Sequence, residues 1–246
     1  MKNPFLDFKK VPVTNKEIPL EQIVWRNRQV VDELLSVYQC LAQDTVKEFC
    51  RLLDQGLRFN VYKAWLSSME LPKFLAATLA NASTIYKSSL RLIQTIEYAP
   101  NDIEELCAVT GLSREAKFEQ TGPMGLYISA LINGSEAGRF ELNLHQQFTK
   151  LHFLGFRLEA GKCLTVHGDL GHFTGAGLQG GTLKVNGSTG SWCGVEMISG
   201  RIKISGDALS KTGERMRGGQ IQVDGRIQQI AKARFGGKIL NNAESE

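Results

Sequence analysis

The carboxy-terminal third of the sequence repeats itself with a constant period, and this repeat limits the possible folds more than any other feature. Between residues 161 and 240, glycine recurs at intervals of about 19 residues. The turn glycines align in three columns, which are Gly168, Gly187, Gly206 and Gly225, then Gly175, Gly194 and Gly213, and finally Gly171 and Gly190. Such a period is typical of a solenoid, because one repeat cannot bury its own apolar face and must stack on its neighbours.

Each repeat also contains a short segment in which apolar and mostly polar residues alternate, as they do in a half-buried strand. The inward positions would form two apolar ladders, one of Leu164, Leu183, Ile202 and Ile221 and one of Val166, Val185, Ile204 and Val223. A further ladder is expected from Leu178, Met197, Met216 and Phe235. We therefore predict an α+β protein whose last part is a short, three-sided, right-handed parallel β-helix with rungs of about 19 residues.

Glycine is expected at the corners of the rungs, where the chain needs either a positive φ or a close approach between backbones. Leu209 stands where the third column requires glycine, so the corner of that rung should differ. Glu196 and Arg215 occupy one column in successive rungs, and we expect them to form an ion pair.

Four segments of the repeat carry a resemblance to a known family: residues 168–171, 175–181, 185–190 and 216–223. In them the sequence resembles the GXGXG β-helix superfamily, which includes the carboxy-terminal domain of the glutamate synthase large subunit and the β-helical subunit of formylmethanofuran dehydrogenase, with its counterpart in bacterial formyltransferase/hydrolase complexes. The resemblance covers about the last third of the chain and mainly implies the fold. In these relatives the β-helix is a scaffold for catalytic partners, so the resemblance implies a similar role and assigns no catalytic residue.

The preceding part of the chain shows the apolar spacing of helices. An extended arm is predicted at residues 1–20, which contain three prolines, and a helical domain at residues 21–125. Pro100 is expected to end one helix, and Asn101 and Asp102 to cap the next. The expected helices are Val30–Leu53, Val61–Met69, Pro72–Ile93 and Ile103–Val109.

Residues 126–158 are predicted to form the transition to the β-helix. Thr121–Gly125 has the composition of a turn, and two β-like runs at 126–132 and 139–144 predict a hairpin. This hairpin would cap the first rung, since an uncovered solenoid end is an aggregating edge. The β-helix would then span residues 159–240, and residues 241–246 would be a disordered tail.

Charge is distributed unevenly between the two parts. Residues 151–246 contain 12 Lys and Arg against 8 Asp and Glu, which accounts for the whole net charge of +4. Lys184, Arg201 and Lys203 should point outward from adjacent rungs, with Lys238 further along. This basic face is either solvated surface or a contact for an acidic protein partner. Nucleic acid is disfavoured because no aromatic residues are interleaved, and a small ligand because a flat strand face has no concavity.

The residues that could carry chemistry form no persuasive site. His167, Asp169 and His172 could make a proton-transfer cluster, but corner packing is favoured because successive rungs supply no nucleophile. Cys193 lacks an adjacent base. Residues 171–181 lead into a strand, whereas a phosphate-binding loop leads into a helix. We therefore assign no catalytic, cofactor-binding or metal-ligating residue, and expect no cofactor.

The sequence favours a non-catalytic scaffold or assembly subunit of a larger enzyme complex, with Lys184, Arg201 and Lys203 as its contact with a protein partner. A homo-oligomer remains open. Two alternatives remain: a subunit of a formylmethanofuran dehydrogenase-like or glutamate synthase-like complex, and a small hydrolase or transferase with a site at the junction of the two parts. No run of 18 or more apolar residues and no signal-like segment is found, so no membrane association and a cytoplasmic location are expected.

Overall fold

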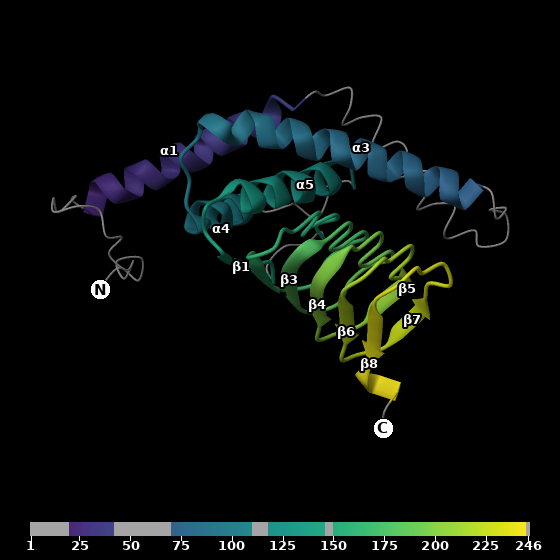
Figure 1. Cartoon of the computed structure of the whole chain (residues 1–246). Coiled ribbons are helices and arrows are strands. Elements are labelled where there is room, and N and C mark those ends of the chain that lie inside the picture. Colours follow the sequence, from purple (N-terminus) through teal and green to yellow (C-terminus); the bar gives the residue numbers. More distant parts are fainter. Residues whose placement is uncertain (1–19, 42–69, 110–117, 146–149, 245–246) are drawn as a thin grey trace.

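The computed structural model describes residues 20–41, 70–109, 118–145 and 150–244. Helices lie at one end of the molecule, and a stack of strands extends away from them (Figure 1). The helices are α1 (Leu20–Gln39), α3 (Glu70–Leu92), α4 (Pro100–Val109) and α5 (Phe118–Gly134), with a short 3-10 turn, η2 (Ile93–Thr95), after α3. The strands follow them in sequence, so the predicted order of a helical part and then a β part is confirmed.

The strands form a parallel β-solenoid with rungs about 19 residues apart, as predicted. Its main sheet has the order β1-β2-β3-β4-β6-β8. In β2, β3, β4 and β6, the two inward ladders lie in register over their whole length, from Leu164 opposite Leu183 to Ile204 opposite Val223. The strands are β1 (Arg139–Asn143), β2 (Cys163–His167), β3 (Gln179–Asn186), β4 (Ser199–Ile204), β6 (Gln220–Val223) and β8 (Lys238–Asn241).

One corner of each rung places three alternate residues in the left-handed conformation. In one rung these are Trp192, Gly194 and Glu196, with φ of 60°, 66° and 53°. A side chain in this conformation costs roughly 1–2 kcal/mol, so the non-glycine positions need compensating contacts. At Gly194 a Cβ would also overlap Cδ1 of Ile221 in the core. Glycine is therefore needed there for both reasons.

Glycine is needed for a different reason in the column formed by residues 168, 187, 206 and 225. At Gly187 the φ is ordinary, but a Cβ would overlap the carbonyl oxygen of Gly168 in the preceding rung. The same close approach recurs between Gly225 and Gly206. Glycine in this column therefore permits backbone-to-backbone contact between rungs.

The corner at Leu209 differs from the others, as predicted. Leu209 lies in β5 (Ala208–Thr212), which pairs in parallel with β7 (Ile227–Ile230) to form a separate two-stranded sheet. At the equivalent position of the preceding rung, a Cβ on Gly190 would overlap the backbone of Gly171 and His172. The chain has turned into a strand at Leu209, and its side chain is 42% exposed.

The predicted hairpin is wrong. Residues 126–132 belong to α5, which also contains the predicted turn Thr121–Gly125, with Pro123 inside the helix. Residues 122–132 are buried on all sides, and such an uninterrupted apolar run does not distinguish a strand from a buried helix. The run at 139–143 is a strand, but it pairs in parallel with β2 and so adds a further rung to the solenoid.

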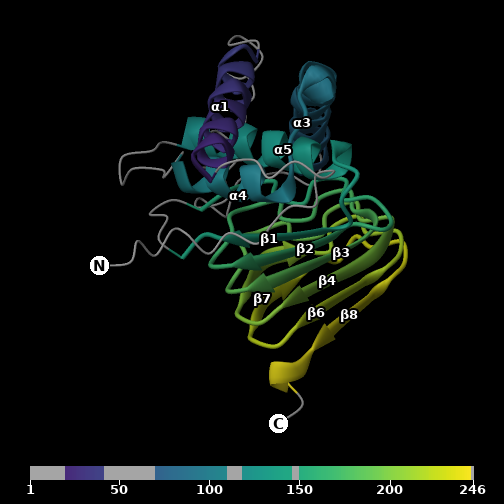
Figure 2. The ribbon, with the colours of Figure 1, turned by 90° about the vertical axis from the view of Figure 1, so that its left-hand side faces the viewer.

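The first rung is covered by helices α4 and α5 instead of a hairpin (Figure 2). Ser129 of α5 joins the two parts: its hydroxyl accepts hydrogen bonds from the backbone N–H groups of Gly155 and Phe156 at 3.0 and 3.2 Å. On the far side of α5, the Tyr127 hydroxyl donates to the carbonyl of Leu34 in α1 at 2.8 Å. One buried core therefore continues from the helices into the solenoid.

Other helical predictions are confirmed in part. Helix α3 matches the predicted Pro72–Ile93 closely, whereas α1 begins earlier than expected, at Leu20. Pro100 begins α4, and the Asp102 carboxylate accepts the N–H of Ala99 at 2.7 Å. The predicted arm up to residue 19, the end of the first helix and the helix Val61–Met69 lie outside the described residues.

The carboxy-terminal end differs from the prediction at two points. Phe235 does not continue the ladder of Leu178, Met197 and Met216, because it is 74% exposed while those three are fully buried. The predicted disordered tail is ordered up to residue 244: Asn241 ends β8, and Asn242–Glu244 form a short 3-10 turn, η3. The Asn242 side chain donates to the Asp224 carboxylate at 2.7 Å, which fixes this turn to the sheet.

Candidate interaction surface

The predicted basic face lies on the outer side of the main sheet. Burial alternates along β3 and β4, so Leu183, Val185, Ile202 and Ile204 are inside, while Lys184, Arg201 and Lys203 are exposed. Lys184 and Lys203 are paired in register on neighbouring strands, roughly 4.8 Å apart along the solenoid. The structure thus brings the three cations predicted from the sequence onto one surface, which we call the basic face.

Most of the positive charge on this surface is uncompensated. Lys203 faces the Asp224 carboxylate at 3.6 Å. Lys184, Arg201 and Lys238 make no ion pair with any residue in the described ranges. Further up the same sheet, Glu141 is 2.7 Å from His167, so this carboxylate is already engaged.

A groove runs across the strands beside Arg201. Its volume is about 690 Å³, and it is lined by Thr182, Gly200, Arg201, Gly218, Gly219, Gln220, Gly237 and Lys238. The glycines are required there: Gly200 and Gly219 have φ of 94° and 84°, and a Cβ on Gly218 would overlap the carbonyl of Ile198. The face is therefore not entirely flat: beside Arg201 it has a shallow, open groove, since these residues have no side chains to fill the surface.

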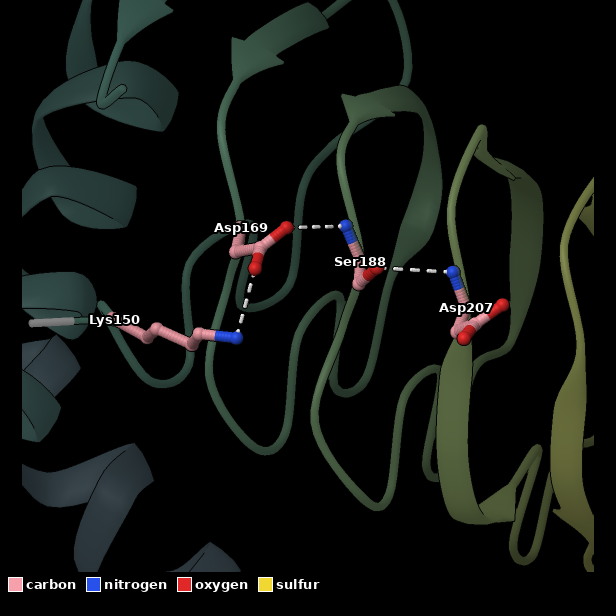
Figure 3. Close-up of polar contacts among 4 residues, drawn as sticks. All are labelled: Lys150, Asp169, Ser188 and Asp207. Atoms are coloured by element: carbon pink, nitrogen blue, oxygen red, sulfur yellow. Dashed lines mark hydrogen bonds and ion pairs between the residues drawn. The ribbon is translucent and has the colours of Figure 1, made fainter. Parts of the chain in front are cut away.

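The residues His167, Asp169 and His172 do not form the proton-transfer cluster considered above. Asp169 belongs to a ladder of side chains that bind backbone N–H groups of the next rung (Figure 3). Its carboxylate accepts the N–H of Ser188 at 2.8 Å, and the Ser188 hydroxyl accepts the N–H of Asp207 at 3.0 Å. The hydrogen bond from Ser188, together with Lys150 at 2.9 Å, lowers the pKa of Asp169. This carboxylate is a structural acceptor.

His172 is part of a second ladder, together with a histidine that the sequence reasoning missed. His152 and His172 stack with ring centroids 5.1 Å apart. His152 Nδ1 accepts the N–H of His172 at 2.8 Å, and His172 Nδ1 accepts the N–H of Ser191 at 2.9 Å. Burial lowers the pKa of His172 to about 4 and that of His152 well below its usual value. Both rings are therefore neutral at pH 7 and hold the backbone in place.

A stack of aromatic rings follows these histidines along the same corner. Phe153, Phe173 and Trp192 lie nearly parallel, with centroids 4.5 and 5.0 Å apart. All three have positive φ, and their stacking offsets part of the cost of that conformation. Next to them, burial raises the pKa of the Cys193 thiol to about 12, so this cysteine is no nucleophile.

A small pocket lies at the junction between α3 and the solenoid. Its volume of about 120 Å³ is below the roughly 300 Å³ of small ligand sites. The carboxylate in its lining is Glu196, which pairs with Arg215 at 3.1 Å and so confirms the predicted ion pair. Arg157, also in the lining, donates to the Ser83 hydroxyl at 3.0 Å. The Arg157–Ser83 hydrogen bond joins α3 to the solenoid, the Glu196–Arg215 pair joins two rungs, and neither provides a pair of titratable groups for hydrolysis.

In the part of the chain that the structure describes, no group of three or more His, Cys, Asp or Glu residues is placed to hold a metal ion. Within those same ranges, no helix has the length and apolar character needed to cross a membrane.

Comparison of the chain with protein-family models, curated proteins and solved structures gives no match. The resemblance to the GXGXG superfamily therefore depends on the glycine columns and on the solenoid that they form.

Proposed function

We propose that this protein is a non-catalytic assembly subunit whose solenoid binds an acidic surface of another protein through the basic face. The observation that carries the proposal is the outward alignment of Lys184, Arg201 and Lys203 on two adjacent strands, with Lys184 and Arg201 lacking an ion pair among the described residues. Charges held at fixed spacing on a sheet raise the rate of encounter with an acidic partner and fix its register.

The fold supports this proposal over a catalytic one. The titratable groups with displaced pKa values bind backbone N–H groups or lie in the core, and none lines the groove beside Arg201. Under the proposal, the helices cover one end of the solenoid and the sheet presents its flank to the partner. We further propose that the chain is a distant member of the GXGXG superfamily, with a partner in a formyl-transfer or glutamate synthase-like complex as the more specific alternative.

The test uses the full chain, tagged and purified from its source cells after chemical cross-linking, with partners identified by mass spectrometry. The double variant Lys184→Glu with Arg201→Glu should lose a partner that the parent retains. The matched control, Lys232→Glu with Arg234→Glu, makes the same charge change at exposed positions after β7 and should retain that partner. Binding should also weaken as salt rises from 0.05 to about 0.5 M, because exposed charges are screened. Retention by both variants would show that the basic face is only solvated surface.

A further inference from the structure

The groove is lined by two cationic residues whose backbone positions have a defined separation. Arg201 is paired with Gln220, and Gln220 with Lys238, across strands β4, β6 and β8. Neighbouring strands lie about 4.8 Å apart, so the two cationic positions are separated by roughly 9.6 Å along the solenoid. This separation is set by the backbone and does not depend on flexible loops.

The rest of the groove favours an extended backbone as its occupant. Four of the eight lining residues are glycines, so a ligand can approach the main chain closely. The lining contains no carboxylate and no aromatic ring. Both cations are exposed, and neither has an ion pair among the residues in the described ranges. The groove thus combines closely approachable main chain with uncompensated positive charge.

We propose that this groove binds an extended acidic segment in which carboxylates recur at every third residue. A polyproline II chain rises about 3.1 Å per residue and has three residues per turn, so such carboxylates lie on one side about 9.3 Å apart. This repeat matches the separation of Arg201 and Lys238, with Gln220 between them to bind the peptide backbone. The inference rests on the proposed function, because it states which part of an acidic partner the solenoid recognises.

Other occupants fit the groove less well. A second copy of the chain related by a two-fold axis would place the same cations opposite each other. Single-stranded nucleic acid is held by base stacking on aromatic side chains, which the lining lacks. A single carboxylate or phosphate would have to draw the long side chains of Arg201 and Lys238 together over Gln220, whereas two spaced carboxylates can be bound where each side chain leaves its strand.

The experiment measures binding of two fluorescein-labelled peptides, each about 12 residues long, to the full chain by fluorescence anisotropy. In the first peptide, glutamate occupies every third position and proline and serine the others. The second peptide has the same composition with its glutamates at alternate positions, so that no two of them are three residues apart. We expect the first peptide to bind at least about tenfold more tightly. Equal affinities would overturn the proposed spacing.

Variants locate the binding site within the solenoid. Gln220→Glu places a carboxylate between the two cations and should weaken the first peptide at least about tenfold. Gln229→Glu is the matched control, because it makes the same change at an exposed strand position of the second sheet and should leave binding unchanged. Lys238→Gln, at an exposed position, should also weaken binding, and melting curves verify that all variants fold. If Gln220→Glu has no greater effect than Gln229→Glu, the groove is not the site.

Two further outcomes separate this inference from the proposed function. A cellular partner that requires Lys184 and Arg201, together with peptides that do not bind, would overturn the groove assignment and leave the assembly role intact. Peptide binding that depends on Gln220, with no cellular partner affected by the charge reversals, would overturn the assembly role and leave the groove assignment intact. A single-stranded DNA oligomer that binds more tightly than the first peptide, and is equally sensitive to Gln220→Glu, would overturn the choice of a peptide as occupant.

Discussion

The stacked pair of His152 and His172 makes the protein sensitive to mild acid. Burial depresses the pKa of both imidazoles, and nearby Lys150 further lowers that of His172. Protonation of either Nδ1 would also abolish the acceptor of a backbone hydrogen bond. The unfolded chain therefore binds these protons more strongly than the folded protein does. Above the unfolded pKa of about 6.5, the two histidines do not change the free energy of unfolding. As the pH falls below this value, the free energy of unfolding decreases.

The size of this effect follows from linkage. With an unfolded pKa of 6.5 and a folded pKa of about 4, His172 alone reduces the free energy of unfolding by about 2 kcal/mol between pH 7.5 and 5. His152, whose pKa is also lowered by burial, adds to this loss over the same interval. The loss from the pair is therefore more than about 2 kcal/mol, a large fraction of the stability of a typical domain.

Urea unfolding followed by circular dichroism at a series of pH values measures this loss. In His172→Asn, the asparagine Oδ1 can still accept the N–H of Ser191 but does not titrate, so the loss between pH 7.5 and 5 should be about 2 kcal/mol smaller than in the parent. His145→Asn makes the same substitution at an exposed site outside the buried stack and is the control. A parent whose stability is constant between pH 7.5 and 5, or a His172→Asn variant with the full slope, would refute the assignment of neutral buried histidines.

Two further predictions concern the rungs. Ile202→Ala removes fully buried methyl groups between Leu183 and Ile221 and should lower the free energy of unfolding by roughly 2–5 kcal/mol in the same urea assay; an unchanged midpoint would contradict the stacked register. Gly187→Ala should lower the free energy of unfolding by about 1–3 kcal/mol, because its Cβ pushes two rungs apart. The control Gly161→Ala should cost less, since φ is 82° there but no atom lies within 4 Å of the added Cβ. A larger loss for Gly161→Ala than for Gly187→Ala would mean that the rungs separate easily.

The solenoid could be predicted from the sequence because stacked turns of equal length give the sequence a constant period. Pairing of β2, β3, β4 and β6 requires equal numbers of residues per turn, so Leu183 and Ile202 align in the sequence as they do in space. The same reasoning failed for Phe235, whose position in the column is correct but which lies in the last rung, where no following turn of the described chain covers it.

The histidine and aromatic ladders were missed for a related reason. His152 and His172 are separated by 20 residues, one more than the period used to align the repeats, and Phe153 and Phe173 have the same separation. The first turn absorbs this extra residue without changing the corner. The groove was also not visible in the pattern, because it arises where side chains are missing. Paired glycines such as Gly218 and Gly219 are typical of tight turns and do not by themselves indicate a groove.

The hydrogen-bond ladder that begins at Asp169 runs in one direction along the solenoid, and it ends at a residue that cannot continue it. Asp169, Ser188 and Asp207 each offer an oxygen to the N–H of the following turn. The next residue in the column is Arg226, whose N–H is bound by Asp207 at 2.8 Å. Its guanidinium has donors only, so it cannot accept the N–H of an additional turn. At this corner the protein thus presents a charged terminus to any strand that might extend the stack, which is how natural sheets discourage end-to-end growth.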